Sequence, residues 1–266
     1  MSVPTSSADL VSRLRAAGCV FAEDEAALIT ETARDATELE AMTVRRVSGV
    51  PLEYVVGWAW FRGLRIAVDP GVFIPRRRTE FLVAEALRVT APGAVVVDLC
   101  CGAGALGAAV ASEREVSLYA ADIEPAAVRC AERNLAPWQG ALSQGDLYDA
   151  LPAQIRGRID VLLANVPYVP TDEIRLLPPE ARLYEPRVTL DGGPDGLSTL
   201  RRVAAGATDW LAPGGHLFVE VSDHQAPVAQ AVFTEYGLTA DLTVDEELGA
   251  NVVHGIYLPV GANPVA

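Results

Sequence analysis

Short apolar segments of strand length alternate with helix-length segments from Pro92 onward, and this alternation constrains the fold more than any other feature. Four of these strand-like segments are Val95–Leu99, Val116–Ala121, Ile159–Ala164 and His216–Val221. Such alternation predicts an α/β fold with a mostly parallel, doubly wound sheet. No helix separates the last two strand-like segments, which predicts an antiparallel hairpin at one edge; they are Leu238–Val244 and Val252–Leu258.

The first seventy residues follow a different pattern. Ala8–Ala17 and Glu23–Val47 carry apolar residues at helical spacing. Trp58–Phe61 and Leu64–Val68 flank a tight turn, which is typical of a short β-hairpin. The expected domains are a helical domain with a β-hairpin over residues 1–70, a connecting segment and helix over 71–92, and the α/β domain over 93–266.

The charge balance excludes several classes of function. The chain has 35 Asp and Glu residues against 21 Arg and no Lys, so its formal net charge is -14. Without Lys, Schiff-base and P-loop lysine chemistry is excluded, and an acidic chain repels the phosphates of nucleic acids. The four Cys residues lack the spacing of a zinc site, and we expect no metal. No apolar run reaches the ~20 residues that span a bilayer, so we expect a cytoplasmic protein with no membrane contact.

A glycine-rich turn follows the strand-like segment Val95–Leu99. Gly102, Gly104 and Gly107 fit the G-x-G-x-x-G pattern of a dinucleotide site. Asp98 precedes this turn, where its carboxylate would oppose a pyrophosphate but attract a ligand with an ammonium and a sulfonium group. The sequence therefore favours S-adenosylmethionine over NAD.

Two further acids extend this nucleotide site. Asp122 ends the second strand, where its oxygens can accept both ribose hydroxyls, and Asp146 follows the presumed third strand, where it can accept from the adenine amino group. The alternative interpretation is that both are ordinary turn residues at strand ends.

Asn165-Val166-Pro167-Tyr168 directly follows the strand-like segment Ile159–Ala164. Ligands bind at the carboxyl ends of parallel strands in open α/β sheets. The Asn165 side-chain carbonyl and the backbone carbonyl before Pro167 can accept the protons of a planar amine, with Tyr168 as a wall. This would turn the nitrogen lone pair toward a methyl donor. The alternative is a plain Asn-x-Pro turn.

These motifs together resemble the HemK/PrmC family of protein-(glutamine-N5) methyltransferases, which methylate the Gly-Gly-Gln motif of peptide-chain release factors. The family motifs G-x-P-x-x-Y-x-x-G, I-P-R-P-x-T-E and N-P-P-Y are similar to Gly49–Gly57, Ile74–Glu80 and Asn165–Tyr168, and the following loop matches at Tyr184–Arg187 and Leu190–Leu197. The resemblance implies a class I S-adenosylmethionine-dependent methyltransferase. Its Rossmann-like catalytic domain would have a mostly parallel seven-stranded sheet with an antiparallel edge hairpin, and a small N-terminal helical domain would dock the substrate.

The resemblance also implies roles by position: Asp98, Gly102 and Gly104 shape the cofactor loop, Asp122 holds the ribose, and Asp146 with Leu147 frames the adenine. The expected catalytic residues are Asn165, Pro167 and Tyr168. The expected cofactor-binding residues are Asp98, Cys100, Gly102, Ala103, Gly104, Asp122, Ile123, Asp146, Leu147 and Asn165. The expected substrate-binding residues are Phe73, Thr79, Glu80, Asn165, Val166, Pro167 and Tyr168.

Three positions depart from the family motifs. Val166 and Arg77 each replace a Pro, and Cys100 replaces the first glycine of D-x-G-x-G-x-G. With these three changes the sequence resembles a divergent actinobacterial branch of the family, and the methyl acceptor of that branch is not established. The resulting run of arginines, Arg76–Arg78, could contact ribosomal RNA, an acidic substrate face or a nearby carboxylate, or could form a solvated turn.

We therefore expect a monomeric S-adenosylmethionine-dependent N-methyltransferase that acts on a protein glutamine, with a release factor as its candidate partner. Catalysis would come from orientation and from acceptors that stabilise positive charge on the nitrogen, because no motif places a base. Two alternatives stay open. One is methylation of a base amine in nucleic acid, against which the overall acidity argues. The other is a cofactor-fold binding protein without catalysis, for which Cys100 and Val166 are the only support in the sequence.

Overall fold

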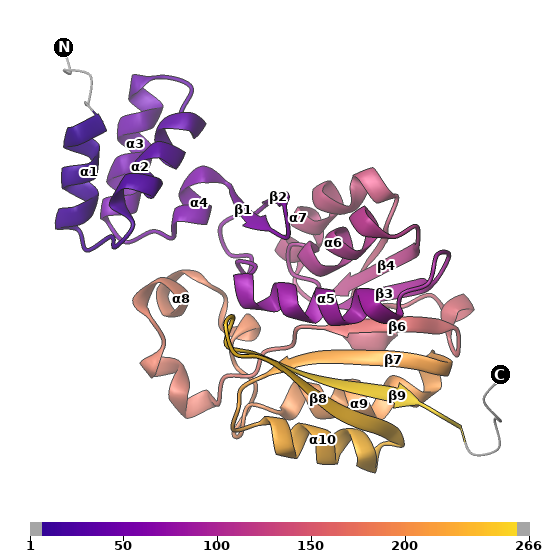
Figure 1. Ribbon diagram of the computed structural model, residues 1–266. Coiled ribbons are helices and arrows are strands. Elements are labelled where there is room, and N and C mark those ends of the chain that lie inside the picture. The colour runs from indigo at the N-terminus through magenta and orange to yellow at the C-terminus, as the bar shows by residue number, and fades with distance from the viewer. Residues whose placement is uncertain (1–6, 260–266) are drawn as a thin grey trace.

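A computed structural model describes residues 7–259 (Figure 1). It contains a seven-stranded sheet in the order β5-β4-β3-β6-β7-β9-β8, in which the pairs from β5 to β7 are parallel and those with β9 are antiparallel. This confirms the predicted sheet and its edge hairpin. The strands are β3 (Val95–Leu99), β4 (Ser117–Asp122), β5 (Ala141–Gln144), β6 (Ile159–Ala164), β7 (Leu211–Val221), β8 (Leu238–Asp245) and β9 (Ala250–Tyr257).

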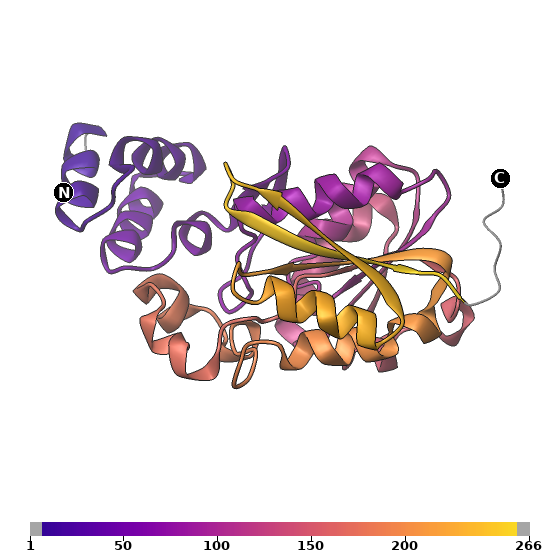
Figure 2. The same ribbon diagram turned by 60° about the horizontal axis from the view of Figure 1, so that its bottom comes forward.

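Helices cover both faces of this sheet (Figure 1, Figure 2). One face packs against α5 (Glu80–Val89), α6 (Ala105–Glu113) and α7 (Pro125–Leu135), and the other against α9 (Ser198–Trp210) and α10 (Ala226–Glu235). Successive side chains of a strand point to opposite faces, so in β3 Val96 lies in the first core and Val97 in the second. Every central strand is therefore buried on both sides, as its continuous apolar sequence requires.

The N-terminal helices form a separate small core. The helices are α1 (Ser7–Ala16), α2 (Ala22–Thr32), α3 (Ala36–Val47) and α4 (Leu52–Val56). Our expectation of a single helical stretch over Glu23–Val47 is wrong, because the side chain of Asp35 accepts hydrogen bonds from the N–H groups of Thr37 and Glu38 and thereby begins a new helix. The buried side chains of this core include Leu10, Leu14, Ile29 and Met42.

The β-hairpin joins the two parts of the chain. It consists of β1 (Trp58–Phe61) and β2 (Leu64–Ala67). Its buried residues Phe61 and Ile66 lie in the core of the large sheet, whereas Trp58 packs with the N-terminal helices. The hairpin, which the sequence analysis assigned to the helical domain, thus packs largely against the α/β domain.

The remaining elements are short. The segment between β6 and α9 contains the helix α8 (Pro179–Tyr184) and will be called the α8 segment (residues 169–191). None of the helices in residues 7–259 has the length and apolar character needed to cross a membrane. The 3-10 helices are η1 (Arg77–Thr79), η2 (Ala136–Trp138), η3 (Leu147–Ala150), η4 (Ala153–Ile155), η5 (Thr171–Leu176) and η6 (Arg187–Thr189).

A pair of histidines links β7 to β9. The Nδ1 atom of His216 and the Nε2 atom of His254 are 2.7 Å apart, and the ring of His254 stacks on Phe218 with 4.3 Å between centroids. Burial, and then the neighbouring His216, lower the pKa of His254 to about 4, while burial also lowers the pKa of His216. Both rings are therefore neutral in the folded protein at pH 7.

We expect this pair to make the fold sensitive to mild acid. The unfolded chain takes up a proton near pH 6.5 and folded His254 only near pH 4, so stability falls as the pH drops between these values. Urea unfolding should show that the free energy of unfolding is lower at pH 5 than at pH 7. We expect His254→Asn to reduce this loss by about 1 kcal/mol, which is less than the full pKa shift implies because the ring is partly exposed to solvent. The exposed His224→Asn is the control and should leave the loss unchanged. An equal loss in the wild type and His254→Asn would contradict this prediction.

Candidate active site

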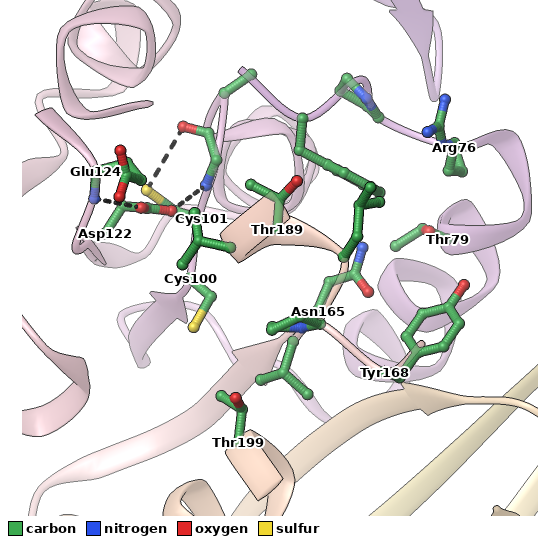
Figure 3. Close-up of a pocket in the computed structure, with 18 of the residues that line it drawn as sticks. Arg76, Thr79, Cys100, Cys101, Asp122, Glu124, Asn165, Tyr168, Thr189 and Thr199 are labelled. Carbon is green, nitrogen blue, oxygen red and sulfur yellow. Dashed lines mark hydrogen bonds between the residues drawn. The ribbon is translucent and has the colours of Figure 1, made fainter. Parts of the chain in front are cut away.

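A cavity of about 810 Å³ lies at the carboxyl ends of β3, β4 and β6, and residues of the α8 segment also line it. Figure 3 shows part of this lining. Most of the predicted site residues line it, and three do not, namely Asp98, Gly104 and Glu80. The predicted residues that line it are Phe73, Thr79, Cys100, Gly102, Ala103, Asp122, Ile123, Asp146, Leu147, Asn165, Val166, Pro167 and Tyr168.

Asp98 supports the glycine loop from behind. Strand alternation places it on the same side of β3 as Val96, under the first turn of α6, where its Oδ2 atom accepts the N–H of Gly107 at 2.9 Å. Burial raises the pKa of Asp98 to about 7. Asp98 therefore shapes the loop, which is the position that the resemblance implies for it. It does not line the cavity, so its carboxylate does not face a ligand there as its charge led us to expect.

The other two predicted residues outside the cavity also hold backbone in place. Gly104 begins α6 at φ +77°, and an added Cβ there would lie 3.1 Å from Leu135 and 3.2 Å from Ala131, so glycine permits close packing of α6 on α7. Glu80 accepts the backbone N–H of Arg62 at 2.9 Å and fastens the hairpin to α5.

Asp122 occupies the end of β4 and faces the cavity (Figure 3). Its Oδ2 atom accepts the N–H of Gly102 at 2.8 Å and its Oδ1 atom accepts the N–H of Glu124 at 2.9 Å. Each oxygen keeps a second lone pair, which suits a pair of ribose hydroxyls. Burial raises the pKa of this carboxyl, and the two backbone N–H groups oppose that shift.

The neighbouring backbone leaves room for a ligand. Gly102 has φ +54°, and a Cβ added there would meet only the Cβ of Phe73, at 3.9 Å, so the loop backbone is open to the cavity. Ile123 and Leu147 supply apolar walls beside it. These surfaces fit the three parts of S-adenosylmethionine: the acid Asp122 suits the ribose, the apolar walls suit the adenine, and the open backbone at Gly102 suits the methionine part.

The end of the cavity that follows β5 holds residues that were not predicted from the sequence. Asp146 lines the cavity, but its Oδ2 atom pairs with Arg202 at 2.7 Å, so an adenine amino group would share this carboxylate with an arginine. Thr199 also lines this end. Thr199 and Arg202 are three residues apart in the first turns of α9 and so share a face, a spacing that is visible in the sequence.

The opposite end of the cavity holds the Asn165 segment (Figure 3). The Asn165 side chain lines the cavity and forms no hydrogen bond with any residue in 7–259. Thr79 stands nearby, with a buried hydroxyl that likewise has no partner in this range. The side chain of Val166 is 2% exposed and lies in the core below, so this residue offers mainly backbone to the cavity.

Ion pairs connect the segments around this end. Glu185 in the α8 segment is buried; it accepts the N–H of Ile74 at 3.1 Å and pairs with Arg76 at 2.5 Å. Arg78 pairs with Glu220 at 2.9 Å. Of the roles considered for Arg76–Arg78, contact with a nearby carboxylate is therefore observed for the first and third arginine.

The fold and the cavity define a class I S-adenosylmethionine-dependent methyltransferase. Residues 63–176 match the methyltransferase small domain family. In sequence, the chain is 37% identical over 218 residues to the release factor glutamine methyltransferase of Geobacter sulfurreducens, which covers 80% of this chain and 75% of the relative. It is also 37% identical over 199 residues to the release factor glutamine methyltransferase of Streptomyces coelicolor, and the match covers 73% of this chain and 70% of that relative. The chain belongs to the family of release factor glutamine methyltransferases.

Solved structures agree with this fold. A ribosomal protein L11 methylase from Lactobacillus delbrueckii subsp. bulgaricus gives a TM-score of 0.53 at 18% identity, covering 72% of this chain and 84% of that one. A methyltransferase from Pyrococcus furiosus gives a TM-score of 0.56 at 16% identity, and the match covers 74% of this chain and 90% of that one. At these identities the likeness shows the fold alone.

We expect Asp122→Ala to weaken S-adenosylmethionine binding by about 10- to 100-fold, because two charge-assisted hydrogen bonds to the ribose are lost. Isothermal titration calorimetry measures this change. Asp149→Ala is the matched control, since Asp149 is an exposed acid close to the same strand ends but outside the cavity. Equal affinities of the Asp122 and Asp149 variants would show that the Asp122 carboxylate does not hold the cofactor.

Proposed function

We propose that this chain transfers a methyl group from S-adenosylmethionine to the side-chain amide nitrogen of a protein glutamine, and that the glutamine of a release factor's Gly-Gly-Gln motif is the acceptor. The observation that carries the proposal is the Asn165 side chain, which faces the cavity with no hydrogen-bond partner in residues 7–259. The names of the relatives support the choice of acceptor.

The Asn165 segment suits a planar –NH2 group. The side-chain oxygen of Asn165 can accept one N–H, and the carbonyl of Val166 can accept the second. Pro167 has no N–H, so this part of the backbone offers an acceptor and no donor. With both protons held in the amide plane, the nitrogen lone pair points out of that plane toward the methyl donor. S-adenosylmethionine supplies the methyl group on a positively charged sulfur.

Catalysis in this arrangement needs no general base before the methyl group moves. The nitrogen–methyl bond forms as the sulfur–methyl bond breaks, S-adenosylhomocysteine is the leaving group, and the strongly acidic N-methylated amide cation then loses its proton to water. Among residues 7–259, no histidine lines the cavity, and burial raises the pKa values of Cys100 and Cys101, so both thiols are protonated. The protein's contribution is to orient a weakly nucleophilic nitrogen and to present oxygen acceptors to the positive charge that develops on it.

A second acceptor class is favoured by one relative. The 4-amino-L-phenylalanine/4-methylamino-L-phenylalanine methyltransferase of Streptomyces pristinaespiralis is 34% identical over 203 residues, covering 73% of this chain and 68% of that protein. An aromatic amine is also planar and could bind between Asn165 and Tyr168. Nucleic-acid bases fit less well, because Arg76 and Arg78 are bonded to Glu185 and Glu220 and the chain is acidic.

Labelled methyl transfer to four acceptors tests the proposal: a release factor, the same factor with its Gly-Gly-Gln glutamine changed to Ala, 4-amino-L-phenylalanine and total RNA. We expect label only in the unmodified release factor. Label in 4-amino-L-phenylalanine or RNA alone would replace the proposed acceptor with the corresponding class.

We expect Asn165→Ala to lower kcat at least 100-fold, because one of the two oxygens that orient the amide is removed. S-adenosylmethionine affinity, measured by calorimetry, should stay within about threefold. Turnover that survives within a few-fold would show that Asn165 does not orient the acceptor.

A further inference from the structure

A buried carboxylate lies beside the strand end from which Asn165 leaves the sheet. Val219 of β7 pairs with Ala164 of β6, so Glu220 is the next residue along β7, and its side chain is 3% exposed. A buried charge is costly unless it is paired and hydrogen-bonded. Its Oε1 atom has two partners, whereas its Oε2 atom is buried with none in residues 7–259.

The two partners are Arg78 and Tyr168. Arg78 donates from Nε to Oε1 of Glu220 at 2.9 Å and from a terminal nitrogen to the hydroxyl of Tyr168. The Tyr168 hydroxyl donates to the same Oε1 at 3.4 Å, and the guanidinium carbon lies 5.7 Å from the ring centroid. Burial, and then Glu220, raise the pKa of Tyr168 to about 12, so the hydroxyl is protonated at pH 7 and can donate its hydrogen bond to Glu220.

The backbone of Tyr168 is held separately. Its carbonyl accepts from Nε2 of Gln225 at 2.8 Å, and Gln225 in turn accepts from the N–H and hydroxyl of Ser222. These bonds fix where the residue sits and leave the direction of its ring to the contacts of the hydroxyl.

Packing alone does not fix that direction. A second cavity of about 180 Å³ is lined by Glu220, Ser222 and Asn251 among others, and Arg78 and Tyr168 line both this cavity and the larger one. They form the partition between the two spaces. A ring without its hydrogen bonds has room to turn into the smaller one.

We propose that Arg78 and Glu220 are positioning residues for methyl transfer, which hold the ring of Tyr168 as the wall opposite Asn165 and so set the width of the slot for the acceptor amide. The inference rests on the proposed function. It concerns how the same site orients its acceptor.

Stability does not explain this arrangement. Glu220 is buried while the side chain of Arg78 is 44% exposed, so the carboxylate loses its hydration and gains an attraction that solvent partly screens. In addition, Oε2 of Glu220 is left without a partner in residues 7–259. With Tyr168, the pair connects three segments that are remote in the sequence, and all three meet where the acceptor would bind. A positioning role accounts for the location of the charge.

Kinetics of Glu220→Gln and Arg78→Met test the proposal, with the release factor as acceptor. We expect kcat to fall 10- to 100-fold while the dissociation constant of S-adenosylmethionine stays within threefold, and Arg78→Lys to recover part of the loss. Tyr168→Phe frees the same ring, so Tyr168→Phe/Glu220→Gln should be no slower than the slower single variant. Glu113→Gln, which removes an acid from an ion pair outside the cavity, is the control. Wild-type kcat in Glu220→Gln and Arg78→Met, or additive effects in the double variant, would overturn the proposal.

A second readout does not depend on the acceptor. With 3-fluorotyrosine at position 168, we expect one narrow fluorine NMR resonance in the otherwise wild-type protein, and a shifted or broadened one in Glu220→Gln and Arg78→Met. An unchanged resonance would overturn the proposal even if the acceptor proves to be an arylamine or a nucleic acid. Failure of the release factor to accept a methyl group, with the expected resonance changes, would refute the proposed acceptor and leave the positioning role in place.

Discussion

Two carboxylates that accept backbone N–H groups hold the turn on which the cavity depends. Asp98 accepts from Gly107 and Asp122 accepts from Gly102, so both sides of the turn between β3 and α6 are attached to neighbouring elements. Residues at positive φ, such as Cys100 and Gly102, are not stabilised by a regular hydrogen-bond ladder of their own. The two carboxylates, together with a backbone hydrogen bond from Cys101 to Ala121, hold the loop backbone at the cavity wall.

Arginine–glutamate pairs connect the segments around the acceptor end. An arginine can bond two partners at once through its planar guanidinium, which the compact ammonium of a lysine does less well. Arg78 uses this property to bond both Glu220 and Tyr168. Because the chain contains no lysine, each of its 21 basic side chains is a guanidinium with this capacity. Two further pairs attach the α8 segment to the rest of the protein; they are Arg46–Glu180 and Arg76–Glu185.

The sequence predicts the sheet better than it predicts the contacts around the cavity. Apolar segments and the missing helix between the last two strands predict the parallel strands and the edge hairpin, because these follow from local patterns. The role of Asp98 depends on which side of β3 is covered by α6, and the strand alone does not show this. The partners of Arg76 and Arg78 lie 109 and 142 positions away, so only the folded chain brings them together.

The two departures that suggested a protein without catalysis have structural explanations that preserve the site. Val166 points its side chain into the core and contributes backbone to the cavity, so a valine there does not remove the expected acceptor carbonyl. Cys100 adopts φ +55°, a conformation that costs a non-glycine residue roughly 1 kcal/mol or more. The loop bears this cost and keeps the backbone of Gly102 open to the cavity, so the change of side chain at position 100 does not close the cavity wall. The sequence features that favoured a non-catalytic protein therefore no longer favour it.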